Sequence, residues 1–273
     1  GSGSDNLFGK IIYLFYAVLF ISFIVLRKKP NLMISFAPYT PIVSKLTNIP
    51  NLTINDTEHA KLQNFLNSLS NKILTPYCFT KDMGRKQIKF DGYLELCYLH
   101  NNYFQPNLSV LNMLGIHKST KFVLLRFVSW KASHDFGENG LSLNHKEILV
   151  KKISQYAKVF ITSEGKLPNS LKKYKINVPP EKIHDVLSFA SLFISEGATM
   201  ASESALLGTP TIYINSLSVG YIEEHRRNGL LNIENNTDRI VKKAIYLLNK
   251  KKSKLRTQEQ VRKILSEKID VIS

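Results

Sequence analysis

The most specific chemical pattern in this sequence is a short glycine turn that leads into a polar helix. A buried apolar strand is predicted to end at Ser195, and Gly197 and Ala198 follow it almost directly. Because these two residues have little or no side chain, a ligand can approach the backbone closely there. Thr199 is predicted to cap the next helix, whose first N–H groups and dipole favour an anion.

One turn further along the same predicted helix, Glu203 supplies a carboxylate. In dinucleotide-binding folds an acidic residue near such a turn accepts hydrogen bonds from the ribose hydroxyls. The turn and the carboxylate together therefore predict an anion site beside a ribose site. The alternative is a tight turn followed by a solvated glutamate, since a strand, a glycine turn and a helix form a common combination.

A second polar group follows a short strand predicted at Leu52–Asn55. Asp56, Glu58 and His59 place two carboxylates and an imidazole within four residues, a set that suits deprotonation of an acceptor hydroxyl. The alternative is that Asp56 or Thr57 only caps a helix starting near Glu58. The sequence contains no Asp-X-Asp motif and no cluster of His and Cys, so it predicts no metal site and disfavours a metal-dependent mechanism.

The elements that must position these residues alternate between short apolar strands and amphipathic helices, as in parallel sheets with crossover helices. In the first half, strands are predicted at Leu32–Phe36, Leu52–Asn55, Lys72–Thr75 and Gln87–Phe90, and helices at Pro41–Leu46, His59–Leu69 and Phe79–Gly84. In the second half, strands are predicted at Lys121–Val128, Val159–Thr162, Ile176–Val178, Leu192–Ser195 and Thr211–Ile214, and helices at Lys146–Gln155, Ile183–Ala190 and Met200–Leu207.

This alternation of strands and helices predicts an α/β protein with two Rossmann-like domains. The pattern breaks after Asp91, and Pro106 begins a new unit, so the boundary is placed near Tyr103. The predicted parts are a first domain over residues 1–103, a second domain over residues 104–250 and a basic helix over residues 251–273. The resemblance given below implies that the first is a partial, acceptor-side domain and the second a nucleotide-sugar domain.

An almost unbroken apolar run, Ile11–Leu26, lies near the N-terminus and is closed by three basic residues and Pro30. It is a little short for a membrane span, and three interpretations stay open: a buried helix, a helix lying in a membrane face, and a true span.

The net charge of +16 predicts attraction to an anionic partner such as a nucleotide or an anionic membrane surface. Two cysteines without a disulfide framework favour a reducing, cytoplasmic compartment.

The turn and helix resemble the donor-site signature of GT-B enzymes, among them the lipid II-forming glycosyltransferase and the UDP-N-acetylglucosamine 2-epimerases. The matching residues are Gly197-Ala198, Ser202-Glu203 and Gly208-Thr209-Pro210. More closely, the chain is similar to an uncharacterised archaeal and bacterial family of predicted GT-B glycosyltransferases, domain of unknown function 354. Its segments are Asn55–Ala60, Arg126–Trp130, Ala132–Asp135 and Pro180–Asp185, within a resemblance that runs from Leu32 to Leu231.

The resemblance implies a role for each matching residue of the donor site. Gly197, Ala198 and Thr199 would hold the donor diphosphate, and Glu203 would bind the ribose. The backbone near Ile183 and His184 would contact the base.

The resemblance also implies a role for the loop after the first strand of the second unit, because open α/β sheets bind ligands at that edge. Ser129, Trp130 and Lys131 would face the donor phosphates. His134 and Asp135 on the same loop would either transfer a proton or only brace the loop.

One departure from the GT-B pattern concerns the first domain, which in that fold begins with strands carrying a glycine- or histidine-rich loop. This sequence starts at what resembles the long helix midway through that domain. Either a preceding piece is missing or another polypeptide supplies it. The first sheet is then expected to have an edge that pairs with another copy of the chain or is covered by the first helix. Asp56–His59 are expected to face Ser129–Asp135 and Gly197–Glu203 across a cleft.

The sequence therefore predicts a membrane-associated, metal-independent glycosyltransferase at the inner face of the cell membrane. Its donor would be a nucleotide-sugar, UDP-linked in the leading interpretation, and its acceptor a lipid-linked molecule or a glycan. No cofactor is predicted beyond this substrate, and no nucleic-acid binding, because no interleaved aromatic and basic motif occurs. The alternatives are a sugar-nucleotide 2-epimerase and a non-catalytic GT-B subunit that anchors a partner at a membrane.

Overall fold

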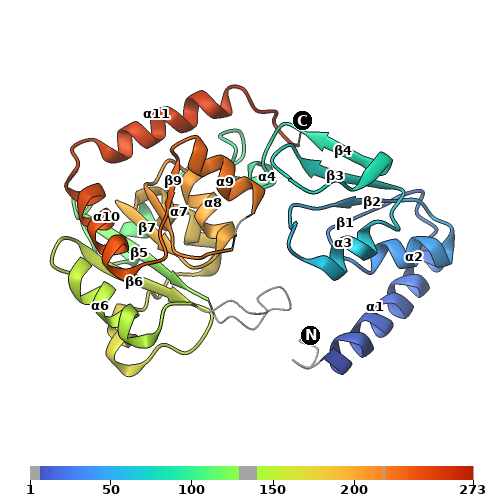
Figure 1. Cartoon of the computed structure of the whole chain (residues 1–273), viewed down its shortest axis with the longest axis horizontal. Coiled ribbons are helices and arrows are strands. Elements are labelled where there is room, and N and C mark those ends of the chain that lie inside the picture. The colour runs from blue at the N-terminus through green and yellow to red at the C-terminus, as the bar shows by residue number, and fades with distance from the viewer. Residues whose placement is uncertain (1–6, 129–139, 218, 273) are drawn as a thin grey trace. The chain divides into compact units, whose positions relative to one another are not determined.

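Figure 1 shows the computed structural model of the chain, in which residues 7–128, 140–217 and 219–272 are described. The chain divides into two compact units, Gly1–Gly92 and Tyr93–Ser273, and each contains its own parallel β-sheet. The structure thus places residues 93–103 in the second unit, whereas the sequence placed the boundary near Tyr103. The bonds that hold this segment, described below, explain the difference.

The first unit contains a four-stranded parallel sheet in the order β1-β2-β3-β4, with the strands in chain order. Its elements are α1 (Leu7–Lys28), β1 (Met33–Ser35), α2 (Thr40–Thr47), β2 (Asn51–Ile54), α3 (Lys61–Asn67), β3 (Lys72–Pro76), the 3-10 turn η1 (Gly84–Lys86) and β4 (Gln87–Phe90). The helix predicted at Phe79–Gly84 is wrong. Gly84 has a left-handed φ of 75° and its N–H donates to Oδ1 of Asp82, so the segment forms a turn.

Helix α1 packs on α2 through one stripe only. Val18 and Val25 are buried in a cluster with Met33 and Val43. Leu14 and Ile21 pack partly buried against this cluster, whereas ten other apolar side chains of the helix are exposed, at Ile11, Ile12, Tyr13, Phe15, Tyr16, Leu19, Phe20, Phe23, Ile24 and Leu26. The interpretation of this run as a fully buried helix is therefore wrong. By length and composition, Ile11–Lys28 is apolar enough to cross a membrane, with a mean hydropathy of 2.0.

The second unit contains a five-stranded parallel sheet in the order β6-β5-β7-β8-β9. Its strands are β5 (Phe122–Phe127), β6 (Lys158–Ser163), β7 (Leu192–Ser195), β8 (Thr211–Tyr213) and β9 (Leu231–Ile233). Its helices are α4 (Leu96–Leu99), α5 (Ser109–Met113), α6 (Leu143–Ile153), η2 (Asn169–Tyr174), η3 (Pro180–Lys182), α7 (Ile183–Phe189), α8 (Ala198–Leu206), α9 (Gly220–Arg227), α10 (Thr237–Asn249) and α11 (Ser253–Leu265). The strand predicted at Ile176–Val178 is wrong, since only an isolated bridge joins Ile161 to Lys175.

Helices cover both faces of this sheet, which is why its strands are apolar runs rather than alternating patterns. Val123 and Leu125 of β5 pack in a cluster with residues of α6 and α10, which lie side by side in Figure 1. Phe122 and Leu124 point to the other face and pack with residues of α5 and α7. Every residue of β7 is buried.

The strand order of this sheet reverses between β5 and β7, because β5 pairs with β6 on one side and with β7 on the other. In open α/β sheets, ligands bind outside the carboxyl ends of the strands at such a switch point. The residues after Phe127 and after Ser195 therefore lie where this fold type places a ligand.

Candidate nucleotide-binding site

The turn after β7 is a compact backbone structure stabilised by a serine. The N–H of Gly197 donates to Ser195 Oγ at 2.9 Å, and that hydroxyl donates to the Gly197 carbonyl at 2.8 Å. A Cβ atom at Gly197 would lie 3.3 Å from Cγ1 of Val128, so the turn passes close to the end of β5. A larger residue at this position would crowd the switch point.

Helix α8 begins directly after this turn. Gly197 is its N-cap, so the prediction that Thr199 caps the helix is wrong: Thr199 is the second helical residue, and among the described residues no side chain caps the helix. Its first turn contains no acidic residue. The N-terminal N–H groups and the helix dipole therefore favour an anion at the switch point, as the sequence predicts.

Glu196, which the sequence reasoning did not select, holds together the two ends of the loop after β5. Its side chain is fully buried. Oε2 accepts a hydrogen bond from the N–H of Val128 at 2.9 Å, and Oε1 accepts one from the N–H of Leu141 at 2.8 Å. Lys146 on α6 contributes its ammonium 3.3 Å from Oε1. The one sequence signal was a carboxylate directly after a buried strand that begins with three apolar residues, because a buried carboxylate requires hydrogen-bond partners.

Several predicted residues lie in the loop between Val128 and Leu141, outside the described residues. They are Ser129, Trp130, Lys131, His134 and Asp135. Their roles at the donor phosphates and in proton transfer stay predictions.

Glu203 lies on α8 with its side chain largely buried, at 7% exposure. Its Oε1 accepts a hydrogen bond from the Tyr98 hydroxyl at 2.9 Å and lies 3.2 Å from Nε2 of His184. The alternative of a tight turn followed by a solvated glutamate is therefore wrong. The sequence could not show these contacts, because Tyr98 is 105 residues away from Glu203 in the chain.

The predicted base-contacting residues open helix α7, which starts at Ile183. The ring of His184 lies 5.5 Å from the ring of Tyr98, at an interplanar angle of 33°, and 6.1 Å from the ring of Phe104. The structure thus brings the side chains of His184 and Glu203 together. It adds two aromatic rings that the sequence reasoning missed.

In the first unit, Asp56, Glu58 and His59 occupy the loop after β2, at the carboxyl end of that strand. The Thr57 hydroxyl donates to Oδ1 of Asp56 at 3.0 Å, while burial raises the pKa of the Asp56 carboxyl above its usual value. Oε1 of Glu58 accepts a hydrogen bond from the N–H of Thr80 at 3.2 Å. The three residues therefore share one loop, held partly by its own side chains.

The alternative role of this loop as a helix cap is wrong. Helix α3 starts at Lys61, its N-cap is Ala60, and no side chain caps it. The loop is held instead by buried Asn64, whose amide donates to the carbonyl oxygens of Thr57 at 3.1 Å and Glu58 at 2.8 Å. The sequence reasoning did not select Asn64.

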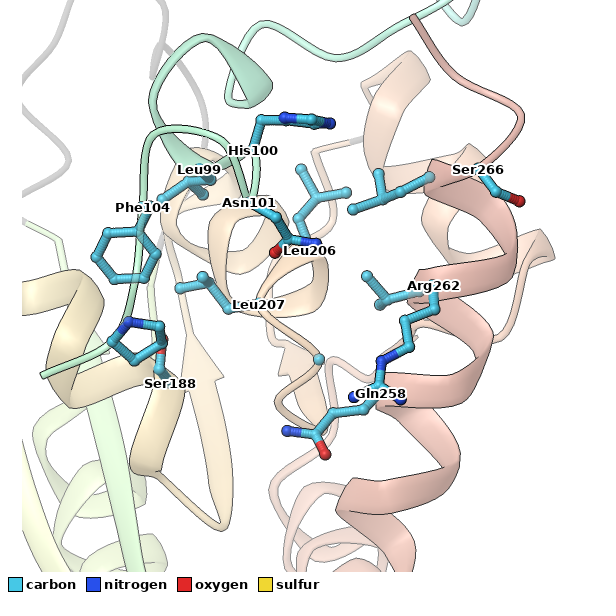
Figure 2. Close-up of a pocket in the computed structure, with 14 residues that line it drawn as sticks. Leu99, His100, Asn101, Phe104, Ser188, Leu206, Leu207, Gln258, Arg262 and Ser266 are labelled. Carbon is cyan, nitrogen blue, oxygen red and sulfur yellow. The ribbon is translucent and has the colours of Figure 1, made fainter. Parts of the chain in front are cut away.

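A cavity of about 500 Å³ lies in the second unit, and Phe104, whose ring contacts His184, is one of its lining residues (Figure 2). Its walls include Leu206 and Leu207, at the opposite end of α8 from Gly197, together with Gln258 and Arg262 of α11. None of the predicted donor-site residues lines it.

Within the described parts of the chain, no three His, Cys, Asp or Glu side chains are grouped so that they could hold a metal ion.

Solved structures with a similar fold include two UDP-GlcNAc 2-epimerases and a glycotransferase. One is the UDP-GlcNAc 2-epimerase of Methanocaldococcus jannaschii in complex with UDP-GlcNAc and UDP. The superposition covers 98% of this chain and 83% of the epimerase chain, with a TM-score of 0.64 and 14% sequence identity. The UDP-GlcNAc 2-epimerase of Neisseria meningitidis, bound to UDP-GlcNAc, matches 93% and 80%, with a TM-score of 0.65 and 11% identity. The glycotransferase of kitacinnamycin matches 93% and 76%, with a TM-score of 0.57 and 11% identity.

These identities are low, so the likeness shows the fold and not the reaction. The fold is α/β of the GT-B type, as the sequence predicts, and it is shared with enzymes that act on nucleotide-sugars. Among curated proteins, the uncharacterized protein MJ0665 of Methanocaldococcus jannaschii is 26% identical over an alignment of 276 positions. The alignment covers 87% of this chain and 80% of that protein. The model of the family described as "Protein of unknown function (DUF354)" matches residues 1–272, and the chain belongs to that family.

Proposed function

We propose that this chain is a metal-independent glycosyltransferase that binds a nucleoside diphosphate sugar, UDP-linked, at Gly197–Glu203. The observation that carries the proposal is the N-terminus of α8 at the switch point of the sheet, which no side chain of the described residues caps, with the Glu203 carboxylate on the same helix. The helix N-terminus suits a diphosphate, and the carboxylate suits the adjoining ribose.

The transfer would be a direct displacement at the anomeric carbon of the donor sugar. The oxygen of the acceptor hydroxyl bonds to that carbon, the bond from the carbon to the diphosphate oxygen breaks, and the diphosphate leaves with the electron pair. The N–H groups at Gly197–Thr199 stabilise the charge on the leaving diphosphate. The hydroxyl proton passes to a general base, for which the sequence predicts Asp56, Glu58 or His59.

The raised pKa of Asp56 is consistent with this use, because a carboxylate with a higher pKa is a stronger base. His134 and Asp135 stay alternative proton acceptors.

A 2-epimerase is the second candidate, favoured by the similarity of the fold to UDP-GlcNAc 2-epimerases. Incubation of the protein with UDP-N-acetylglucosamine alone, followed by product analysis, separates the two functions. A glycosyltransferase leaves the sugar configuration at C2 unchanged and releases UDP only when an acceptor is added. An epimerase forms the C2 epimer without an acceptor, and that result would contradict the proposal.

We propose further that the enzyme works at the cytoplasmic face of the cell membrane on a lipid-linked acceptor. The support is helix α1, whose apolar side chains Phe15 and Phe20 are 61% and 67% exposed, and the basic residues Arg27 and Lys28 in its last turn. An apolar face beside basic residues favours an anionic lipid surface. A protein without this binding would leave about ten large apolar side chains of α1 in water.

Liposome flotation tests the membrane proposal. We expect the protein to float with vesicles that contain anionic phospholipid, and the double substitution Phe15→Lys and Phe20→Lys to leave most of it in the soluble fraction. The matched control is Tyr246→Lys, which changes an aromatic residue of α10 that is 55% exposed, and it should float like the original chain. Flotation of the double variant to the same extent would contradict a role for this helix face.

A further inference from the structure

Both contacts that the described residues make with the Glu203 carboxylate involve the same oxygen. Oε1 accepts the hydrogen bond from Tyr98 and lies next to His184 Nε2. A carboxylate offers about four acceptor positions over its two oxygens. Holding Oε1 fixes the plane of the carboxylate and leaves Oε2 for a donor from a ligand.

Tyr98 is held at its hydroxyl while its ring stays accessible. The residue is 42% exposed, although its hydroxyl binds a glutamate that is 7% exposed. Its ring is tilted by 33° from the ring of His184, and the ring of Phe104 meets His184 at an angle of 81°. An exposed aromatic face beside a ribose-binding carboxylate suits a planar nucleobase, because bases stack on aromatic side chains.

The segment that carries Tyr98 is fixed at both ends by the C-terminal part of the chain. The Tyr93 hydroxyl donates to Oε1 of Glu224 at 2.8 Å, and the same oxygen accepts from Lys268 at 3.0 Å. Further along, Oδ2 of Asp270 accepts from the Tyr103 hydroxyl at 2.8 Å. Tyr98 is therefore pre-positioned before a ligand arrives, which lowers the entropic cost of binding.

We propose that Tyr98 positions Glu203 for the donor ribose and supplies the aromatic surface on which the nucleobase packs. This inference rests on the proposed nucleotide site. It adds a residue outside the donor signature, from the segment where the chain enters the second unit.

Isothermal titration calorimetry with UDP and with inorganic pyrophosphate tests this role. Tyr98→Phe keeps the ring and loses the hydrogen bond to Glu203, so we expect UDP binding about 3–10-fold weaker. Tyr98→Leu loses the ring as well, and we expect UDP binding roughly 30–100-fold weaker. Pyrophosphate has neither ribose nor base, so its Kd should change less than about twofold in both variants. Tyr246→Leu, at an exposed aromatic position on α10, is the matched control and should leave both ligands unaffected.

The outcomes separate this inference from the proposed function. If the unsubstituted chain binds UDP and Tyr98→Leu binds it with the same Kd, the role of Tyr98 is refuted and the nucleotide site stands. If Tyr98→Leu loses pyrophosphate binding to the same extent as UDP binding, Tyr98 only maintains the fold, and the inference is again overturned. If the unsubstituted chain binds pyrophosphate but not UDP, both proposals fail together.

Discussion

Replacing Glu196 with alanine is expected to lower the free energy of unfolding of the second unit by roughly 3–5 kcal/mol, the usual range for removing one partner of a buried charge network. The substitution leaves the N–H groups of Val128 and Leu141 without their acceptor and removes the carboxylate that faces Lys146. Urea unfolding followed by far-ultraviolet circular dichroism measures the loss.

The matched control for this prediction is Glu234→Ala. Glu234 also follows a strand directly, since β9 ends at Ile233, but none of the described residues forms a hydrogen bond with its side chain. We expect this variant to lose less than about 1 kcal/mol. Equal losses in the two variants would show that Glu196 does not hold the loop ends.

The second large effect concerns His225, which is fully buried on α9. Its Nε2 is 2.9 Å from the Ser202 hydroxyl, and its ring lies 4.6 Å from the ring of Tyr93. Burial lowers the pKa of His225 from 6.5 to about 4; nearby Glu224 opposes this shift and Lys268 adds to it. In the unfolded chain, His225 therefore binds a proton below about pH 6.5. In the folded chain it stays neutral until the pH falls to about 4.

The stability that depends on neutral His225 is consequently complete above pH 6.5 and lost as the pH falls toward 4. The loss is on the order of 3 kcal/mol for a shift of this size. His225→Gln keeps a polar group for Ser202 but does not titrate, so we expect its unfolding free energy to fall less between pH 7 and pH 4.5. Urea unfolding at a series of pH values measures both curves, and parallel curves would contradict the prediction.

The sequence predicted best those elements whose residues are determined locally. Strand β7 was predicted with its bounds, Leu192–Ser195, because three consecutive apolar residues are expected in a strand whose sheet is covered on both faces, and Ser195 begins the polar turn that ends the strand. Strand β9 was missed because it has three residues, and only Leu231 among them is buried. The helix start at Ala198 was placed too late because the backbone of Gly197 begins α8 without help from the Thr199 side chain.

The parts of the site that the sequence did not predict depend on contacts between distant segments. Glu196 meets its backbone partners 68 and 55 residues away, and Tyr98 meets Glu203 across 105 residues. No local pattern marks such a contact before the chain is folded. A charged residue inside an apolar stretch indicates only that some partner must exist.

Calorimetric titration of UDP into the intact chain and into Glu203→Gln tests the central claim, a nucleoside diphosphate site at Gly197–Glu203, most directly. The glutamine keeps the volume and one acceptor oxygen for Tyr98 but removes the charge offered to the ribose. We expect UDP to bind the intact chain and to bind Glu203→Gln about 10–100-fold more weakly, the range for losing a hydrogen bond to a charged group. The exposed Glu259→Gln on α11 should bind like the intact chain. Equal UDP affinity in folded Glu203→Gln, or no binding of UDP by the intact chain, would contradict the account.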